Sequence, residues 1–385
     1  MSWNDLIGLE REKLLLQKAI LSNKIASAYL FYGNEGIGKK AMAIQFAKTI
    51  NCEKPIINLD KNLIDSCEEC SSCRMMKNLS HPNLHLIFSI PTGKASEVKS
   101  DNPLNKLDDK QIVELQLQLE KLAKNPYHRF FLSGAHTIKI DQIRDLKKKI
   151  ALSSAQKGKT FIIVFNADEM TRESANAFLK TLEEPNDNTH IILITSQKDA
   201  ILDTILSRTQ LFYFHTPTIE EISTGLIEKF KIETSRAHLI AALSNGSIVS
   251  AIEQLGKEFV DLRSELVDIL RVALRKKNYR IELIERIDKL IKENDSREII
   301  SALLLFEFWF RDALYYSKSN DLLKIINLDM QDVIHKFVNN INNFDYNEAI
   351  KLIEKSINLI KKNVNIQLIL VNLYLNIRTL WHKFY

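Results

Sequence analysis

A glycine-rich segment flanked by apolar runs constrains the fold of this chain more than any other feature. The apolar run SAYLFYG (27–33) precedes it, and KAMAIQFAKTI (40–50) follows it with a helical pattern. A buried strand that turns through glycines into a helix is typical of α/β proteins that hold a phosphate group at the helix N-terminus. We therefore predict a strand over 27–33 and a helix over 40–50.

The loop itself, GNEGIGKK (33–40), nearly matches the pattern G-x-x-x-x-G-K-[ST] of phosphate-binding loops. Gly33, Gly38 and Lys39 stand at the expected positions, and Gly36 adds to the backbone cradle. Lys40, however, stands where the pattern has a hydroxyl for magnesium. The loop thus keeps its anion-binding residues but lacks one metal ligand, and either a nucleotide or a bare anion is compatible with it.

Short apolar runs alternate with amphipathic stretches over the first 215 or so residues. TFIIVF (160–165) and HIILIT (190–195) are continuous apolar runs, suited to strands that are covered on both faces. Between them TRESANAFLKTLEEP (171–185) has a helical period and ends at a proline. This alternation predicts an α/β fold with a parallel sheet over 1–215, with a polar, partly helical insertion at 89–131.

Only helical patterns follow the segment HTPT (215–218). We predict a small helical lid domain over 216–262 and an all-α C-terminal collar domain over 263–385, which makes three domains in all. In NEAIKLIEKSINLI (347–360), for example, five apolar residues share one helical face: Ala349, Leu352, Ile353, Ile357 and Ile360.

The overall composition is that of an ordinary globular protein. Of the 385 residues, 45% are hydrophobic and 26% are charged, and the formal net charge of +5 permits a nucleic-acid neighbour without requiring one. The segment MSWNDLIGLEREKL (1–14) carries charges early and lacks the apolar core of a signal peptide. The longest apolar runs are too short to span a bilayer. We therefore expect a cytoplasmic protein without a membrane partner.

All four cysteines fall within one short segment: Cys52, Cys67, Cys70 and Cys73. Four thiolates can close a tetrahedron around Zn²⁺, and a closed shell leaves no position for a substrate, so we predict one structural zinc ion. A disulfide is disfavoured in a cytoplasmic protein, and an iron–sulfur cluster is the less favoured alternative. His81 and His85 are alternative ligands, but we expect them to be ordinary residues that lead into the next strand.

Several motifs occur in an order that resembles one family. They are SAYLFYGNEGIGKK (27–40), the four-cysteine segment (52–73), IKIDQIRDLKKKI (138–150), NADEM (166–170), ANAFLKTLEEP (175–185), ILSRTQ (205–210), GSIVSAI (246–252), FEFWFRDALYYS (306–317) and NVNIQLILVNLYL (363–375). With them the chain resembles the delta-prime subunits of the bacterial DNA polymerase III clamp loader, members of the AAA+ clamp-loader family. LKTLEEP followed by SR is specific to clamp-loader subunits, and the cysteine segment narrows the choice to delta-prime or its gamma/tau sibling.

The resemblance identifies the residues that would have to hydrolyse ATP. Phe165 and Asn166 fall where active relatives carry the magnesium-binding Asp and the water-activating Glu. Val249 falls where active siblings carry an arginine that touches the γ-phosphate. Together with Lys40, these replacements imply a subunit without intrinsic ATPase activity. Asp168 is expected to cap the next helix and not to bind a metal.

The resemblance also implies a catalytic role in a neighbouring subunit. Ser207 and Arg208 match the family's S-R-C motif, with Thr209 in place of the cysteine, and in the family this arginine reaches the ATP of the next subunit. The implied function is a non-hydrolysing stator in a pentamer with delta and gamma/tau subunits, which places the sliding clamp on primer-template DNA as part of the DNA polymerase III holoenzyme. The alternatives are a gamma/tau-type ATPase, a zinc-dependent nucleic-acid-binding protein and, for Arg208 alone, a surface ion pair.

Overall fold

The computed structural model of the chain describes most of its residues. They are residues 2–58, 60, 62–91, 103–153, 158–185, 188–255, 259–321, 325–341, 343–362 and 364–382. Packing divides the chain into two compact units: Met1–Phe230 with Gly246–Ile252, and Lys231–Asn245 with Glu253–Tyr385. The division into three domains, with boundaries after residues 215 and 262, stays a prediction.

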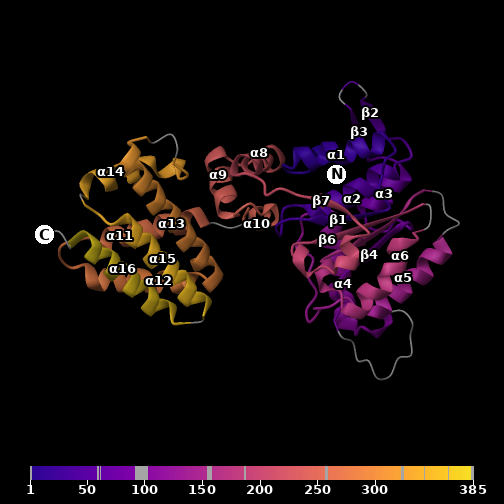
Figure 1. Cartoon of the computed structure of the whole chain (residues 1–385). Coiled ribbons are helices and arrows are strands. Elements are labelled where there is room, and N and C mark those ends of the chain that lie inside the picture. The colour runs from indigo at the N-terminus through magenta and orange to yellow at the C-terminus, as the bar shows by residue number, and fades with distance from the viewer. Residues whose placement is uncertain are drawn as a thin grey trace. The chain divides into compact units, whose positions relative to one another are not determined.

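A five-stranded parallel sheet lies at the centre of the first unit (Figure 1). In spatial order its strands are β4 (Leu84–Ile87), β5 (Thr160–Val164), β6 (Thr189–Thr195), β1 (Ala28–Tyr32) and β7 (Gln210–Tyr213). Leu30 of β1 lies opposite Leu193 of β6 on one side and Leu211 of β7 on the other. The three predicted strands are confirmed as β1, β5 and β6, and the α/β fold class is confirmed with them.

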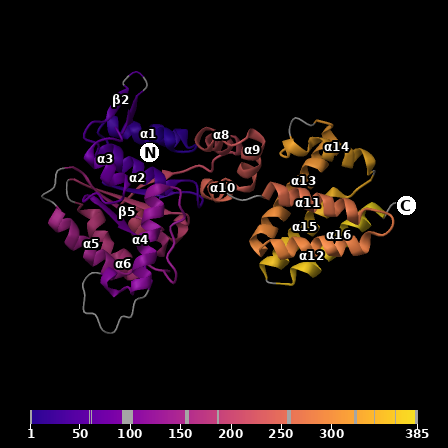
Figure 2. The ribbon, with the colours of Figure 1, turned by 180° about the vertical axis from the view of Figure 1, so that it is seen from behind.

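Helices cover both faces of this sheet, which is why β5 and β6 are buried along their whole length (Figure 2). On one face α5 (Ile140–Ser153) and α6 (Arg172–Glu183) pack on apolar side chains of the strands, such as Ile162. On the other face α2 (Lys39–Ile50) places the ring of Phe46 6.1 Å from that of Phe161. The predicted helices at 40–50 and 171–185 are thus confirmed as α2 and α6.

The other elements of the first unit surround this core. They are η1 (Trp3–Asp5), α1 (Glu10–Leu21), the antiparallel hairpin of β2 (Ile56–Asn58) and β3 (Leu63–Asp65), α3 (Ser71–Lys77), η2 (Pro103–Lys106), α4 (Asp109–Lys124), η3 (Ala167–Glu169), η4 (Lys198–Ala200), α7 (Asp203–Leu206) and α8 (Ile219–Phe230). Helix α4 confirms the helical part of the predicted insertion, while residues 92–102 of that insertion lie outside the described residues.

All secondary-structure elements among the described residues of the second unit are helices, joined by loops (Figure 1). Its elements are α9 (Thr234–Leu243), the end of α10 (Ile248–Gln254), α11 (Phe259–Ala273), α12 (Tyr279–Glu293), α13 (Ser296–Ser319), η5 (Leu328–Met330), α14 (Gln331–Asn340), α15 (Tyr346–Lys361) and α16 (Ile366–His382). Trp309 and Phe310 of α13 are fully buried in its core, and the apolar stripe predicted at 349–360 faces the same core from α15. Among the described residues, no helix is long and apolar enough to cross a membrane.

Candidate functional site

The glycine loop joins β1 to α2 in the conformation that its sequence requires. Gly36 and Gly38 have φ values of +76° and +100°, in the left-handed region that favours glycine. A Cβ atom on Gly36 would clash with the hydroxyl oxygen of Ser247, because the segment before α10 packs directly on the loop. The backbone N–H of Val249 also donates a hydrogen bond to the Gly36 carbonyl over 3.0 Å. The lid segment 246–252 therefore closes one side of the loop.

Lys39 keeps the position of the loop's cation. Its side chain is buried, and its Nζ donates hydrogen bonds to the carbonyls of Gly33 at 2.7 Å and Asn34 at 2.5 Å, and to the Ser196 hydroxyl at 3.2 Å. Burial and the neighbouring charge of Lys40 lower the pKa of Lys39 to about 8. The residues predicted to bind a phosphate, Gly33, Gly36, Gly38 and Lys39, thus form one continuous cradle at the start of α2.

Lys40 and Phe165, the two residues that replace expected metal ligands, contact each other. The Nζ of Lys40 lies 5.0 Å from the centroid of the Phe165 ring, as in a cation–π contact. Phe165 follows directly on β5, is 1% exposed, and packs its ring against Phe130 and Phe88. Burial lowers the pKa of Lys40. An ammonium group and an aromatic ring therefore lie together at the two positions where the family resemblance predicts the loss of metal ligands.

The polar side chains that follow Phe165 form hydrogen bonds within the protein. Asn166 has a φ of +49°, and its Nδ2 donates a hydrogen bond to Glu169 over 2.8 Å. Asp168 accepts a hydrogen bond of 2.5 Å from the Thr195 hydroxyl at the end of β6. The prediction that Asp168 caps the next helix is wrong, because Thr171, which directly precedes α6, caps it by accepting from the Ser174 N–H.

A cavity of about 330 Å³ lies over the glycine loop. Asn166, Asp168 and Glu169 line it together with a segment that the sequence did not predict to reach the site. This covering segment is 126–131, from the end of the predicted insertion. Tyr127 is buried against Gly38, and its hydroxyl accepts a hydrogen bond of 2.6 Å from the backbone N–H of Ile7. Arg129 pairs with Glu35 of the loop at 3.0 Å. The run of aromatic residues YHRFF (127–131) in an otherwise polar insertion was the signal available in the sequence.

The four cysteines converge at the other end of α2, as predicted. Their Sγ atoms all lie within 4.8 Å of one another, and those of Cys67 and Cys73 are 4.0 Å apart. A tetrahedral zinc site with Zn–S bonds of about 2.3 Å needs sulfur atoms about 3.8 Å apart, so this cluster fits the ion. The N–H of Cys70 donates to Cys67 Sγ and lowers the pKa of that thiol to about 6, whereas burial raises the pKa of Cys52 and of Cys73.

The histidines near this cluster have other roles. Nδ1 of His81 accepts a hydrogen bond from the Asn83 N–H at 3.1 Å, so Nε2 carries the proton and donates to the Ser72 hydroxyl at 3.1 Å. Both ring nitrogens of His81 are thus used within the protein. His85 lies on β4, and the group of candidate ligands among the described residues contains cysteines alone.

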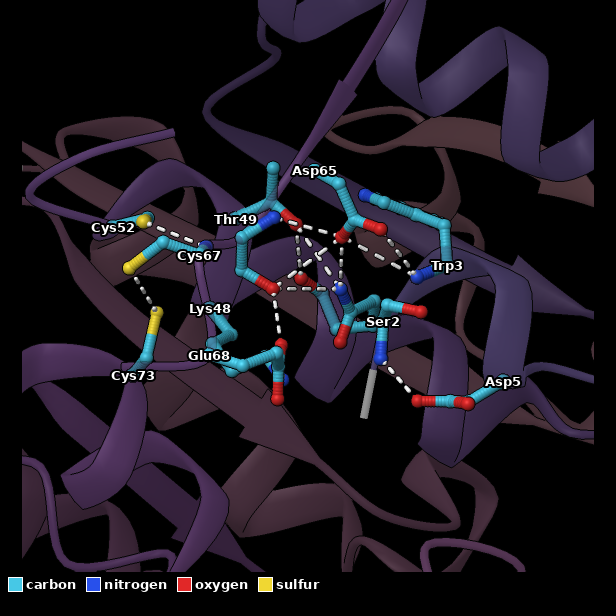
Figure 3. Close-up of polar contacts among 12 residues, drawn as sticks. Ser2, Trp3, Asp5, Lys48, Thr49, Cys52, Asp65, Cys67, Glu68 and Cys73 are labelled. Atoms are coloured by element: carbon cyan, nitrogen blue, oxygen red, sulfur yellow. Dashed lines mark hydrogen bonds and ion pairs between the residues drawn. The ribbon is translucent and has the colours of Figure 1, made fainter. Parts of the chain in front are cut away.

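A polar network fastens the cysteine segment to α2 and to the N-terminal segment (Figure 3). Lys48 of α2 forms an ion pair of 2.5 Å with Glu68, which follows the candidate ligand Cys67. Asp65 of β3 accepts hydrogen bonds from the Trp3 N–H at 3.2 Å and from Gln45 of α2 at 3.1 Å. These contacts tie the cysteine segment both to the helix that begins at the glycine loop and to the N-terminal segment.

Arg208 lies at the surface, between α7 and β7. Its guanidinium forms an ion pair with Glu183 at the end of α6, with N–O distances of 2.7 and 2.8 Å, and it donates to the Thr204 carbonyl at 3.0 Å. The Ser207 hydroxyl accepts a further hydrogen bond from Arg208 over 3.1 Å. The side chain remains 35% exposed. The surface ion pair that the sequence offered as an alternative is therefore present, and the catalytic role of Arg208 and Ser207 stays a prediction.

The fold and the loop together define a phosphate-loop protein of the AAA+ class. The glycine loop joins β1 of a parallel sheet to α2, and the segment 246–252 packs on the loop. A family model described as DNA polymerase III, delta subunit, matches residues 9–218, more than half of the chain. The chain belongs to this family.

Curated relatives agree with this assignment. The DNA polymerase III subunit delta' of Bacillus subtilis is 27% identical over 325 residues, which cover 83% of this chain and 82% of that protein. The delta' subunit of Haemophilus influenzae is 26% identical, covering 68% of this chain and 64% of the relative. The tau subunit of Bacillus subtilis is 25% identical over 83% of this chain, but the match spans only 51% of tau.

Proposed function

We propose that this chain is a non-hydrolysing subunit of the bacterial clamp loader, a stator that supplies Arg208 to the ATP site of a neighbouring subunit. Relatives named DNA polymerase III subunits delta' and tau support membership of that complex. The observation that carries the absence of hydrolysis is the contact between Lys40 and Phe165, 5.0 Å apart over the loop. A phenyl ring offers magnesium no oxygen ligand, and the half-buried Lys40 ammonium repels the cation.

The remaining parts of the site support the same reading. Hydrolysis of a phosphoanhydride needs a group that orients the attacking water, and the amide of Asn166 instead donates to Glu169. Glu169 itself accepts a second hydrogen bond from Ser89, so it is held away from the role of a free base. Val249 brings an apolar side chain to the cavity where an arginine would stabilise the transferred phosphoryl group.

Arg208 has the geometry of a group that can act in another subunit. Its guanidinium is at the surface, and two of its nitrogens contact the same oxygen, Oε1, of Glu183, an anionic acceptor of the kind that a phosphoryl oxygen also provides. We propose that assembly exchanges this carboxylate for the γ-phosphate of the neighbour's ATP. Ser207 would then orient Arg208 through the hydrogen bond between them.

The other assignments complete this proposal. The four cysteines would hold a structural Zn²⁺, and the helical residues 263–385 would form a collar that binds delta and gamma/tau subunits in a pentamer. Through that complex the chain would act on the sliding clamp and on primer-template DNA in the cytoplasm. The lid over 216–262 would connect the collar to the AAA+ domain over 1–215.

A loader reconstituted with Lys39→Ala in this chain tests the proposal against the alternative of a gamma/tau-type ATPase. Since no hydrolysis depends on Lys39 here, clamp loading and DNA-stimulated ATPase should stay near wild-type rates. The matched control is the corresponding lysine substitution in the gamma/tau loop, which should abolish turnover at those sites. A loss of ATPase from Lys39→Ala comparable to that of the control, in a correctly assembled complex, would contradict the proposal.

A further inference from the structure

The second unit contains a groove of about 450 Å³ between α11 and α14. Both helices pack on α13, whose Trp309 lines the groove between them. One wall consists of residues of α11: Val267, Leu270, Arg271, Leu274 and Arg275. The other wall consists of residues of α14 and the residue after it: Val333, Lys336, Phe337, Asn340 and Ile341. Each wall follows the spacing i, i+3, i+4, i+7, i+8, so this α11–α14 groove runs along about two turns of each helix.

Trp309 gives the groove an unpaired hydrogen-bond donor. The residue is fully buried, and among the residues that the structure describes its Nε1 has no hydrogen-bond partner. Its ring is held edge-on by Phe310 at 5.1 Å and by Phe337, which also lines the groove, at 4.8 Å. A buried N–H group without an acceptor is costly, so a ligand that brings an acceptor into the groove gains from it.

The charged residues that line the groove are all basic. They are Arg271, Arg275 and Lys336, and no Asp or Glu among the described residues lines it. Arg271 pairs with Asp268 at 2.6 Å and Arg275 pairs with Glu282, but both pairs are open to solvent and are therefore weak. Lys336 is exposed and forms no ion pair within the described part of the chain. The groove thus combines apolar walls with a positive rim.

We propose that the α11–α14 groove binds an acidic amphipathic helix of a partner protein. Two helical walls side by side accept a third helix whose apolar residues recur at i, i+3, i+4 and i+7. The apolar side chains of that helix pack on Leu274 and Phe337, its carboxylates meet Arg271 and Lys336, and a polar side chain accepts from the Trp309 N–H. The inference does not depend on the proposed loss of hydrolysis, because it concerns the second unit and is tested on the isolated full chain.

Fluorescence anisotropy of a labelled model peptide with the full-length protein tests the proposal. The peptide has leucines at the i, i+3, i+4 and i+7 positions of a helix and glutamates at most others. We expect saturable binding at micromolar concentration that weakens as salt rises. A scrambled peptide of the same composition, and one with lysines in place of the glutamates, should each bind at least about tenfold more weakly. No saturation at millimolar peptide, or equal binding of all three, would overturn the proposal.

Lys336→Glu measures the contribution of the positive rim. Because Lys336 is exposed, the variant should fold, and binding of the acidic peptide should weaken about fivefold or more, since an attraction is replaced by a repulsion. The matched control is Lys355→Glu, an exposed lysine of α15 that does not line the groove. Equal weakening in both variants, or unchanged binding in Lys336→Glu, would contradict the assignment.

The indole N–H of Trp309 reports whether the peptide reaches the groove. The chain has three tryptophans, so the indole resonance of Trp309 in a nuclear magnetic resonance spectrum is assigned with Trp309→Phe. When the acidic peptide binds, this N–H proton should move downfield, as a proton does that gains a hydrogen bond. Binding that leaves the resonance unmoved would place the peptide elsewhere and refute the assignment. Sedimentation of the chain alone should show a monomer, and a dimer that is lost in Lys336→Glu would make a second copy the occupant and would also refute it.

Discussion

Helix α2 has a candidate site at each end, and the two sites differ in completeness. At its N-terminus lie the glycine loop and Lys39, beside Lys40 and Phe165, which are predicted to replace metal ligands. Just beyond its C-terminus, Cys52 begins a set of four thiols that fits a tetrahedral ion. A structural zinc site needs only its ligands, whereas hydrolysis needs a metal, a base and a cation together. We therefore propose that the cysteine site is complete while the glycine-loop site has lost hydrolysis and kept its fold.

Removal of the zinc ligands should have the largest effect on the molecule. Cys70→Ala leaves three thiolates, and because metal binding is coupled to folding, the first unit should lose stability on the order of several kcal/mol. Metal analysis and thermal melting of the variant measure both consequences. The control is Lys54→Ala, an exposed neighbour of Cys52 that binds no metal. A metal-free Cys70→Ala protein that melts like the wild type would contradict a structural role.

Substitution of Arg208 should have the next largest effect, confined to one site of the assembled complex. An arginine finger is worth roughly 10³ to 10⁵ in rate at the site that it completes, so Arg208→Ala should reduce total ATPase in part and clamp loading further. Folding should be unaffected, because an exposed ion pair contributes about 0–1 kcal/mol. The measurement is the clamp- and DNA-stimulated ATPase of a reconstituted loader.

Glu183→Gln is the matched control for Arg208. It removes the ion pair seen in the isolated chain but leaves the arginine in place. ATPase at wild-type rate in Glu183→Gln, with a loss in Arg208→Ala, is the expected pattern. Wild-type rates in both variants would show that Arg208 is a surface ion-pair residue and nothing more.

Substitution of His215, which follows β7, should have the smallest effect: a change in how local stability depends on pH. Burial lowers the pKa of His215, but the hydrogen bonds and charges of Glu12 and Glu221 outweigh it, and the net pKa is raised. A raised folded-state pKa gives stability that is present below the unfolded value of about 6.5 and is lost as pH rises through the folded value. Since His215 is one-third exposed, we expect about 0.5 kcal/mol.

Hydrogen exchange of β7 and α1 measures that contribution, because local opening reports on the tie between them. In His215→Ala, protection should fall more at about pH 6 than at about pH 8. The same loss at both values would mean that His215 acts through packing and not through its charge.

The sequence predicted the parts of the fold whose signals are local. Continuous apolar runs sufficed for β1, β5 and β6, and the clustering of cysteines in the sequence sufficed for the convergence of the four thiols. The covering segment 126–131 was not predicted to reach the loop, because its place depends on long-range contacts such as that of Tyr127 with Ile7. The contact of Lys40 with Phe165 was equally invisible, since each residue read alone is only a missing ligand.

The N-terminal cap of α6 is a second feature that the sequence alone did not predict correctly. Asp168 and Thr171 are both good capping residues placed shortly before α6, and propensity does not separate them. In the structure Asp168 lies within η3 and accepts from the Thr195 hydroxyl of β6, while Thr171 directly precedes α6 and caps it. Only the packed sheet brings that hydroxyl into reach.

The central claim is that the cysteine site binds zinc while the glycine-loop site no longer hydrolyses ATP. It is tested most directly on a single preparation of the full-length protein. Zinc content and magnesium-dependent ATP turnover should be measured on the same sample. The account predicts about one Zn²⁺ per chain, the number that one tetrahedral site holds, and ATP turnover no higher than background. Turnover that disappears in Lys39→Ala, or a folded protein without zinc, would contradict it.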